Sequence, residues 1–186
     1  MNACDVTIRA AREHERDEIL SVHLDAFGDE EGPVIAKLVG ELLDDPTSRP
    51  IDSLVAESDG HLVGHVLFTA VTVEPDEAQV RHLILAPLAV VTEKQSLGIG
   101  ARLVREGFRR HSNDEAGLIF VLGYPDYYLR FGFQPAGPCG FLAPYPIADE
   151  HADAWMVREL VSGAIERHKG IVRCSKALDH PQYWRE

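Results

Sequence analysis

Apolar and polar positions follow one another in patterns that predict the elements of the first half of the chain. Residues 6–9 alternate as in a short strand. Residues 12–27 and 31–43 carry apolar side chains three or four positions apart, which predicts two helices, the second ending before Asp44. Strands are predicted at 53–57 and 62–73, since the Asp59-Gly60 pair between them is typical of a tight hairpin turn.

The pattern changes in the middle of the chain. After a turn at 74–77, residues 80–91 predict a strand that contains Pro87, where it should be bulged or unpaired because proline donates no N–H. A helix from Gly98 to about His111 follows. Its outer face carries four arginines, Arg102, Arg105, Arg109 and Arg110.

The last third of the chain predicts shorter elements. Residues 118–122 are all apolar, as in a strand buried on both faces. A helical turn or two at 126–131 precedes a Pro/Gly-rich loop at 135–146, and 155–160 with 171–175 look like a closing pair of strands. The order predicts an α/β fold in one domain over 1–186, with an antiparallel first half and a parallel crossover through the helix at Gly98.

Composition and charge narrow the class of protein. The 186 residues are 45% apolar and 26% charged, as in a globular chain. A net charge of −12 argues against sequence-independent nucleic-acid binding, because phosphates would be repelled. The same field would attract a cationic partner such as an amine, although acidity can equally serve solubility alone.

Cysteines and hydropathy point to a cytoplasmic protein. Cys4, Cys139 and Cys174 form no CxxC pair, so idle thiols are expected rather than a disulfide framework. No signal peptide is visible at the N-terminus, and the longest apolar run, 83–91, is too short to span a bilayer. No membrane partner is therefore expected.

A glycine-containing turn carries the main chemical signal. Gln95, Gly98 and Gly100 lie where the strand at 80–91 ends and the next helix begins. Such a turn aims backbone N–H groups and the positive end of the helix dipole at one point, which suits a pyrophosphate. The spacing fits neither a Walker loop nor a dinucleotide fingerprint.

Two motifs resemble the GNAT acetyltransferase superfamily. Gln95-x-x-Gly98-x-Gly100 matches its pyrophosphate loop, and Tyr128-x-x-x-Gly132-Phe133 matches its Tyr-x-x-x-Gly-Phe motif. The strings 86–90, 120–133 and 155–160 resemble the YhbS-like branch of predicted N-acetyltransferases. The sequence departs from the family at three positions. Thr92 stands where relatives often have Pro, Ser96 stands where many have a basic residue or glycine, and Tyr124 stands where the branch often has a polar residue.

The resemblance implies a mixed sheet of six to seven strands, with helices on both faces and a bulged central strand splayed to accept acetyl-CoA. The pantetheine arm would pair with the backbone of this strand, and the N–H of Ala89 or Val90 would stabilise the oxyanion. Acetyl-CoA is the implied cosubstrate, and no metal is expected. The implied cofactor-binding residues are Leu88, Ala89, Val90, Val91, Gln95, Ser96, Leu97, Gly98, Ile99 and Gly100, with Arg102 or Arg105 as further phosphate contacts.

Tyr128 matches the family's general acid, which protonates the departing thiolate. A phenol is protonated at neutral pH and can donate, whereas the structural alternative is an aromatic side chain that packs against Phe131 and Phe133. No general base is evident. His82, Glu57 and His65 are candidates that surface or packing roles explain equally well, and His61 with His65 is too few ligands for a metal site.

These observations imply an acetyl-CoA-dependent N-acetyltransferase acting on a primary amine of a small molecule or peptide. The acidic stretch at 29–31, expected between the first two helices, could attract the ammonium group or simply favour a helix start. Two alternatives stay open, a non-catalytic acyl-CoA-binding regulatory module and an enzyme acting on nucleotide phosphates. The oligomeric state also stays open, with a homodimer as one alternative.

Overall fold

The computed structural model describes residues 6–75, 80–112 and 117–184. The turn residues Asp76 and Glu77, together with Cys4, lie outside this part of the chain. The helices are α1 (Arg16–Asp44), α2 (Ile99–Arg110), α3 (Pro125–Tyr128) and α4 (Ala164–Arg167). The strands are β1 (Thr7–Ala10), β2 (Asp52–Ser58), β3 (His61–Glu74), β4 (His82–Val90), β5 (Leu118–Leu122), β6 (Gln134–Pro135), β7 (Phe141–Leu142), β8 (Trp155–Glu159) and β9 (Gly170–Arg173).

The fold is the mixed α/β class that the sequence predicts. The main path of the sheet has the strand order β1-β2-β3-β4-β5-β8-β6, and two short strands, β7 and β9, lie off this path. No described helix has the length and apolar character needed to cross a membrane.

The chain divides into two compact units, each of which is described by itself. The first unit comprises Met1–Asp44, Ile51–Phe68 and Ala86–Arg109. The second comprises Asp45–Pro50, Thr69–Leu85 and Arg110–Glu186. Both β3 and β4 run from one unit into the other, so the single domain predicted over 1–186 stays a prediction.

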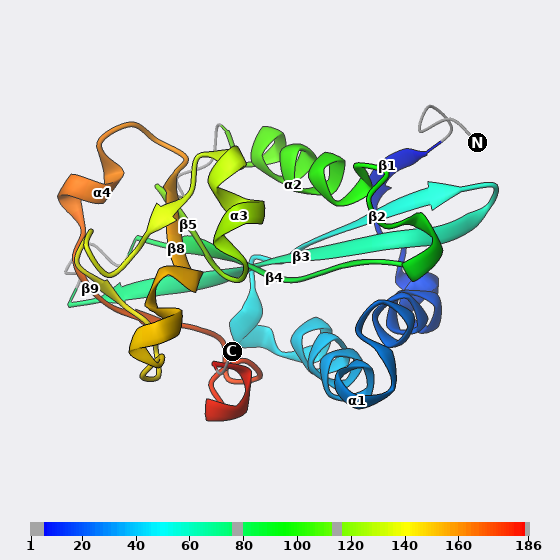
Figure 1. Ribbon diagram of the computed structural model, residues 1–186, viewed down its shortest axis with the longest axis horizontal. Helices are drawn as coiled ribbons and strands as arrows, with labels where there is room; N and C mark the ends of the chain where they lie inside the picture. The colour runs from blue at the N-terminus through cyan, green and yellow to red at the C-terminus, as the bar shows by residue number, and fades with distance from the viewer. Residues whose placement is uncertain (1–5, 76–79, 113–116, 185–186) are drawn as a thin grey trace. The chain divides into compact units, whose positions relative to one another are not determined.

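In the first unit, α1 is a helical hairpin rather than a straight helix. A straight helix of 29 residues would separate its ends by about 42 Å. Instead, the guanidinium group of Arg16 donates to both carboxylate oxygens of Asp44 at 2.7 Å. The chain reverses at Gly28, whose φ of 70° and ψ of −170° are accessible essentially to glycine alone. Figure 1 shows the two halves of α1 side by side.

Helices cover both faces of the antiparallel strands in this unit. On β3, Gly64 faces α2, since an added Cβ would lie 3.1 Å from the Leu103 side chain. The next residue, His65, faces the other way and bonds to His23 of α1. Because side chains alternate along a strand, α1 and α2 lie on opposite faces, as Figure 1 shows.

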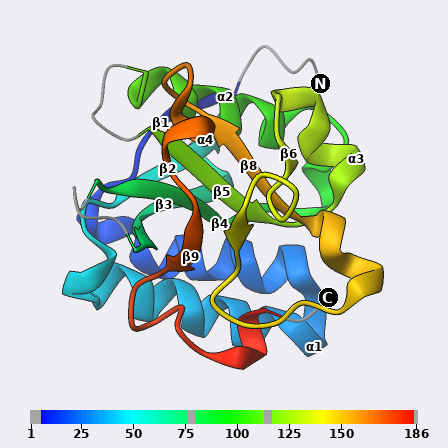
Figure 2. The same cartoon turned by 90° about the vertical axis from the view of Figure 1, so that its left-hand side faces the viewer.

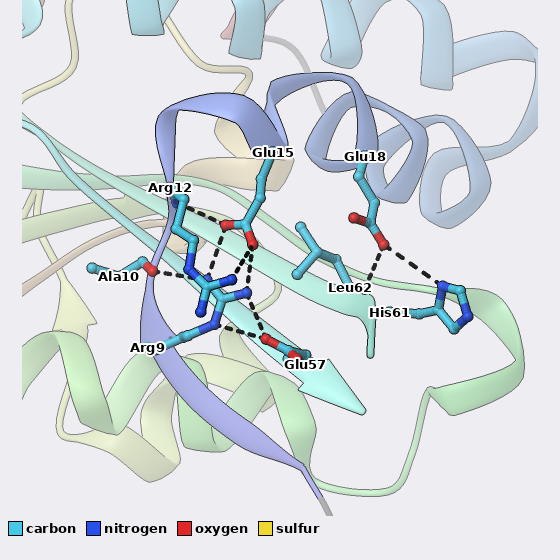
Figure 3. A network of polar contacts seen from close by, with 8 residues as sticks. All are labelled: Arg9, Ala10, Arg12, Glu15, Glu18, Glu57, His61 and Leu62. Atoms are coloured by element: carbon cyan, nitrogen blue, oxygen red, sulfur yellow. Dashed lines mark hydrogen bonds and ion pairs between the residues drawn. The ribbon is translucent and has the colours of Figure 1, made fainter. Parts of the chain in front are cut away.

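A partly buried ion-pair network joins β1, β2 and the 3₁₀ turn at Glu13–Glu15 that directly precedes α1 (Figure 3). The Arg9 guanidinium donates to Glu57 at 2.8 Å and to Glu15 at 2.9 Å. The Glu15 carboxylate also accepts the backbone N–H of Arg12 at 2.7 Å. Hydrogen bonding to Arg9 lowers the pKa of Glu15, which is only 7% exposed, to about 2.

The second unit is built around β5, which lies between β4 and β8 (Figure 2). All but the last of its side chains are buried, as the apolar run predicts. The pairing of β5 with β4 is parallel and covers only Leu83–Ile119 and Ile84–Phe120, so it ends before Pro87. The pairing of β5 with β8 is antiparallel along its whole length.

Three sequence-based expectations need correction. The two late strands do not pair with each other: β8 pairs with β5 and β6, whereas β9 pairs with β3 and β7. Residues 29–31 do not form a loop between two helices, because only Gly28 leaves the helical conformation of α1. Finally, Arg102 does not simply face solvent, since its guanidinium donates to the carbonyl of Val6, the residue directly before β1.

Candidate functional site

The candidate pyrophosphate loop lies in the first unit, between β4 and α2. After a 3₁₀ turn at Thr92–Lys94, the chain reaches Ser96 and Gly98, which have φ values of 61° and 80°. The first helical bond of α2 runs from Arg102 N–H to the Gly98 carbonyl. The backbone N–H groups just before Arg102 therefore have no partner within the helix and point out of its N-terminus.

Space is open at the centre of this loop. An added Cβ at Gly98 would have no heavy atom within 4 Å. Gln95, Ser96 and Leu97 are also exposed. Backbone N–H groups, open space and the positive end of the helix dipole together form a surface that can accept an anion.

The end of β4 is oriented by its hydrogen bonds to β3. The N–H of Val91 donates to the Val63 carbonyl at 3.0 Å, so Val91 points toward β3. Because successive backbone groups alternate in direction, the N–H of Val90 points toward the opposite edge of β4. The Val90 carbonyl on that edge accepts the side-chain amide of Gln95 at 3.1 Å, which ties the loop to the strand.

Thr92 ties α1 to the start of the same loop. Its backbone N–H donates to the Asp25 carboxylate at 2.6 Å, and its hydroxyl donates to the Asp25 carbonyl at 3.2 Å. A proline at this position would lack the N–H. The departure from the family pattern at Thr92 therefore creates a contact that the sequence did not reveal.

Tyr128 lies in the second unit, at the end of α3. Its ring packs between Tyr127, Phe131 and Phe133, with ring centroids 5.0, 6.4 and 5.6 Å away. Burial raises the pKa of Tyr128, so the phenol stays protonated well above neutral pH. The packing role and the proton-donor role that the sequence suggested are thus compatible in one side chain.

The three candidate bases have different surroundings. Glu57 is held by the Arg9 guanidinium. His82 is fully buried in the second unit, with its ring centroid 4.7 Å from that of His168. His65 is fully buried in the first unit, where Nδ1 lies 2.8 Å from His23 Nε2 and Nε2 lies 2.9 Å from Ser53 Oγ.

Sequence reasoning missed both His23 and Ser53. His23 follows Ile19 by four residues on the apolar face of α1, and a polar residue at that spacing signals a buried polar contact. Its partner could not be identified, because His65 lies 42 residues away.

Other candidate features give little sign of a ligand. Within residues 6–75, 80–112 and 117–184, no three His, Cys, Asp or Glu side chains are grouped to hold a metal ion. Cys139 and Cys174 are free thiols, and burial raises the pKa of both. Residues 29–31 are exposed in the first turn after the α1 reversal, where acidic side chains favour a helix start.

Comparison with known proteins connects this geometry to a family. The Acetyltransferase (GNAT) domain family matches residues 7–136. The chain is 39% identical to the uncharacterized N-acetyltransferase YjhQ of Escherichia coli K12, over 91% of this chain and 92% of that protein. It is 28% identical to the uncharacterized N-acetyltransferase YhbS of the same strain, over 74% of this chain and 78% of that protein.

Solved structures agree with these sequence relatives. The crystal structure of YhbS from E. coli in complex with CoA superposes with a TM-score of 0.84 at 26% identity, over 95% of this chain and 93% of that one. A GNAT acetyltransferase from Brucella melitensis in complex with acetyl-CoA gives a TM-score of 0.71 at 25% identity, over 94% and 98% of the two chains. The chain therefore belongs to the GNAT acetyltransferase family of acyltransferases.

Proposed function

We propose that this protein transfers an acetyl group from acetyl-CoA to a primary amine of a small molecule or peptide, by direct attack of the amine. The main support is the open loop at Ser96–Gly98, which presents backbone N–H groups at the start of α2. Relatives of similar fold are described in complex with CoA and acetyl-CoA. The pyrophosphate would lie against Gln95, Ser96, Leu97, Gly98, Ile99 and Gly100.

The pantetheine arm would pair with the edge of β4 that faces away from β3, along Leu88, Ala89, Val90 and Val91. Of the two residues considered for the oxyanion, Val90 is the better candidate, because its N–H points to that edge. The amine nitrogen attacks the thioester carbon and forms the C–N bond. The negative charge that develops on the carbonyl oxygen is stabilised by this N–H.

Collapse of the tetrahedral intermediate breaks the C–S bond and releases the CoA thiolate. We assign Tyr128 as the donor of the proton that this thiolate takes up. A buried, protonated phenol supports the assignment, and so does the match of Tyr128 to the family motif. The ammonium form of the acceptor must lose a proton before attack, because only the free amine has a lone pair. The nitrogen of the tetrahedral intermediate then loses a second proton as the amide forms, and this proton restores the phenol of Tyr128.

The test is a free-thiol release assay with acetyl-CoA and a panel of amines: spermidine, benzylamine, amino acids and short peptides. Product masses identify the acceptor, and calorimetry measures CoA affinity separately. Thiol release together with an acetylated product supports the proposal. CoA binding without turnover on any amine would instead favour the non-catalytic acyl-CoA-binding module. Competition by ATP for the CoA site would favour an enzyme that acts on nucleotide phosphates.

A further inference from the structure

Three polar side chains form a continuous hydrogen-bonded chain inside the first unit. Ser53 Oγ of β2 lies 2.9 Å from His65 Nε2 of β3, and His65 Nδ1 lies 2.8 Å from His23 Nε2 of α1. Both histidines are fully buried, whereas Ser53 is partly exposed. The hydrogen-bonded chain therefore runs from a partly exposed residue to an imidazole in the interior.

The hydrogen-bonded chain ends at a buried ring nitrogen of His23. Among the described residues, His23 Nδ1 has no hydrogen-bond partner. With neutral imidazoles, two tautomeric arrangements satisfy both internal bonds. In the first arrangement His23 Nδ1 carries a lone pair, His23 Nε2 donates to His65 Nδ1, and His65 Nε2 donates to Ser53 Oγ. In the second arrangement His23 Nδ1 carries a proton, and the donor and acceptor of both bonds are exchanged. A buried nitrogen without a partner is costly, so it is a natural place for a ligand atom or a water to bind.

This hydrogen-bonded chain lies beside β4, whose last residues are proposed above to bind acetyl-CoA. Gly64, the neighbour of His65, approaches β4 so closely that an added Cβ would be 3.2 Å from the Ala89 carbonyl. Val63, two residues before His65, accepts the N–H of Val91. All of these residues belong to the first unit.

We propose that His23, His65 and Ser53 form a proton relay that deprotonates the ammonium group of the acceptor. The inference rests on the proposed N-acetyltransferase function. An N–H bond of the ammonium breaks as His23 gains a proton at Nδ1. The Nε2 proton of His23 passes to His65 Nδ1, the Nε2 proton of His65 passes to Ser53 Oγ, and the Ser53 hydroxyl proton leaves to bulk water.

The relay resets by the reverse transfer once the product has left. A water at His23 Nδ1 then takes the proton, and bulk water returns one at Ser53. Throughout, both rings stay neutral, which suits their surroundings: burial lowers the pKa of His23 to about 3 and lowers that of His65 as well. The ring of Phe27 stacks on that of His23, with centroids 6.1 Å apart, and would have to turn aside to admit the amine.

The experiment compares wild type with His23→Gln and His65→Gln, using the panel amine that the wild type acetylates fastest. At pH 7 this amine is an ammonium ion, and each variant should lose about 100-fold in kcat, a typical contribution of general base catalysis. The comparison is restricted to acceptors whose amine pKa lies well below 10, such as benzylamine or a peptide α-amine. At pH 10 such an amine is largely neutral and needs no base, so the ratio of wild-type to variant kcat should fall toward one. KM for acetyl-CoA should change by less than about twofold.

Thr69→Val is the matched control, because it also removes a buried polar group from β3 but lies outside the relay. It should leave kcat unchanged at both pH values. Circular dichroism checks that each variant folds, and Ser53→Ala provides a second test at the partly exposed end, where a several-fold loss of kcat is expected.

Each outcome decides the proposal. A loss of kcat that is the same at pH 7 and pH 10 shows a purely structural role and overturns the relay, as does wild-type kcat in both histidine variants. In either case the acetyltransferase activity of the wild type stands. A wild-type protein that binds CoA but acetylates no amine refutes the proposed function, and the relay with it.

Discussion

Tyr128 allows a sharp test at the scale of a single residue. Tyr128→Phe keeps the ring packing against Phe133 and removes only the hydroxyl. If this hydroxyl protonates the thiolate, kcat should fall about 100-fold while CoA affinity, measured by calorimetry, stays the same. Tyr127→Phe is the matched control and should retain activity. Unchanged kcat in Tyr128→Phe, with chemistry shown to be rate-limiting, would remove Tyr128 from this role.

Gly98 tests the cofactor loop at the same scale. Gly98→Ala places a methyl group in the open space where a phosphate would approach the backbone, so CoA binding should weaken by about tenfold or more. Gly60→Ala is a close control, since φ is 79° at Gly60 and 80° at Gly98, and neither added Cβ meets a neighbour. Equal CoA affinities in the two variants, by calorimetry, would contradict the loop assignment.

At the scale of single residues, the sequence reveals local motifs but not contacts between distant residues. Tyr128 and the loop glycines could be proposed as site residues from the sequence, because their motifs are short and contiguous and local spacing carries the signal. The bonds of His65 to His23 and to Ser53 join residues 42 and 12 positions apart. Only the packing of α1 against β3, and of β3 beside β2, determines that these side chains meet.

At the scale of elements, the Arg9–Glu15–Glu57 network joins β1, β2 and the 3₁₀ turn that precedes α1. Glu15→Ala leaves the partly buried Arg9 guanidinium with Glu57 as its remaining carboxylate partner, and we expect the free energy of unfolding to fall by about 2 kcal/mol. Glu13→Ala removes an exposed carboxylate from the same 3₁₀ turn and should cost less than about 0.5 kcal/mol. Urea denaturation of both variants measures the difference, and equal losses would refute a stabilising role for the network.

Local sequence patterns were sufficient to predict one strand pairing and insufficient for another. The hairpin from β2 to β3 was predicted because Asp59 and Gly60 favour the positive φ values, 54° and 79°, that the turn adopts. The pairing of the late strands was wrong, because alternation along a strand identifies the strand but carries no information about its neighbour. That neighbour is chosen by the sheet as a whole.

At the scale of the whole molecule, acidification should destabilise the protein in two steps. The folded pKa of His23 is about 3 and its ordinary value is 6.5, so between these values the unfolded state binds more protons. The free energy of unfolding should therefore fall as the pH drops below 6.5, at up to about 1.4 kcal/mol per pH unit for each of the two buried imidazoles, since burial lowers the pKa of His65 as well. Glu15, with its pKa lowered from 4.5 to about 2, adds a second loss below pH 4.5.

Urea denaturation from pH 7 to pH 4, followed by circular dichroism, measures this dependence. His23→Gln should reduce the slope above pH 4.5, whereas Thr69→Val, which removes a buried polar side chain that does not titrate, should not. Both tryptophans, Trp155 and Trp184, belong to the second unit, so their fluorescence reports whether that unit unfolds together with the first. A slope that is the same in the His23 variant and the wild type would contradict the assignment.

The sequence by itself determined most of the helices and longer strands, the α/β class and the family, because each depends on residues close together in the chain. It also located the glycine-containing turn between β4 and α2, whose role in binding pyrophosphate stays a prediction. Tertiary structure alone decided that α1 folds back at Gly28, that Thr92 binds Asp25, and that His23, His65 and Ser53 form one buried chain. These contacts join distant residues, and burial then changes their chemistry. The imidazole of His23 would titrate near neutral pH in water, but it is held neutral once α1 packs against β3.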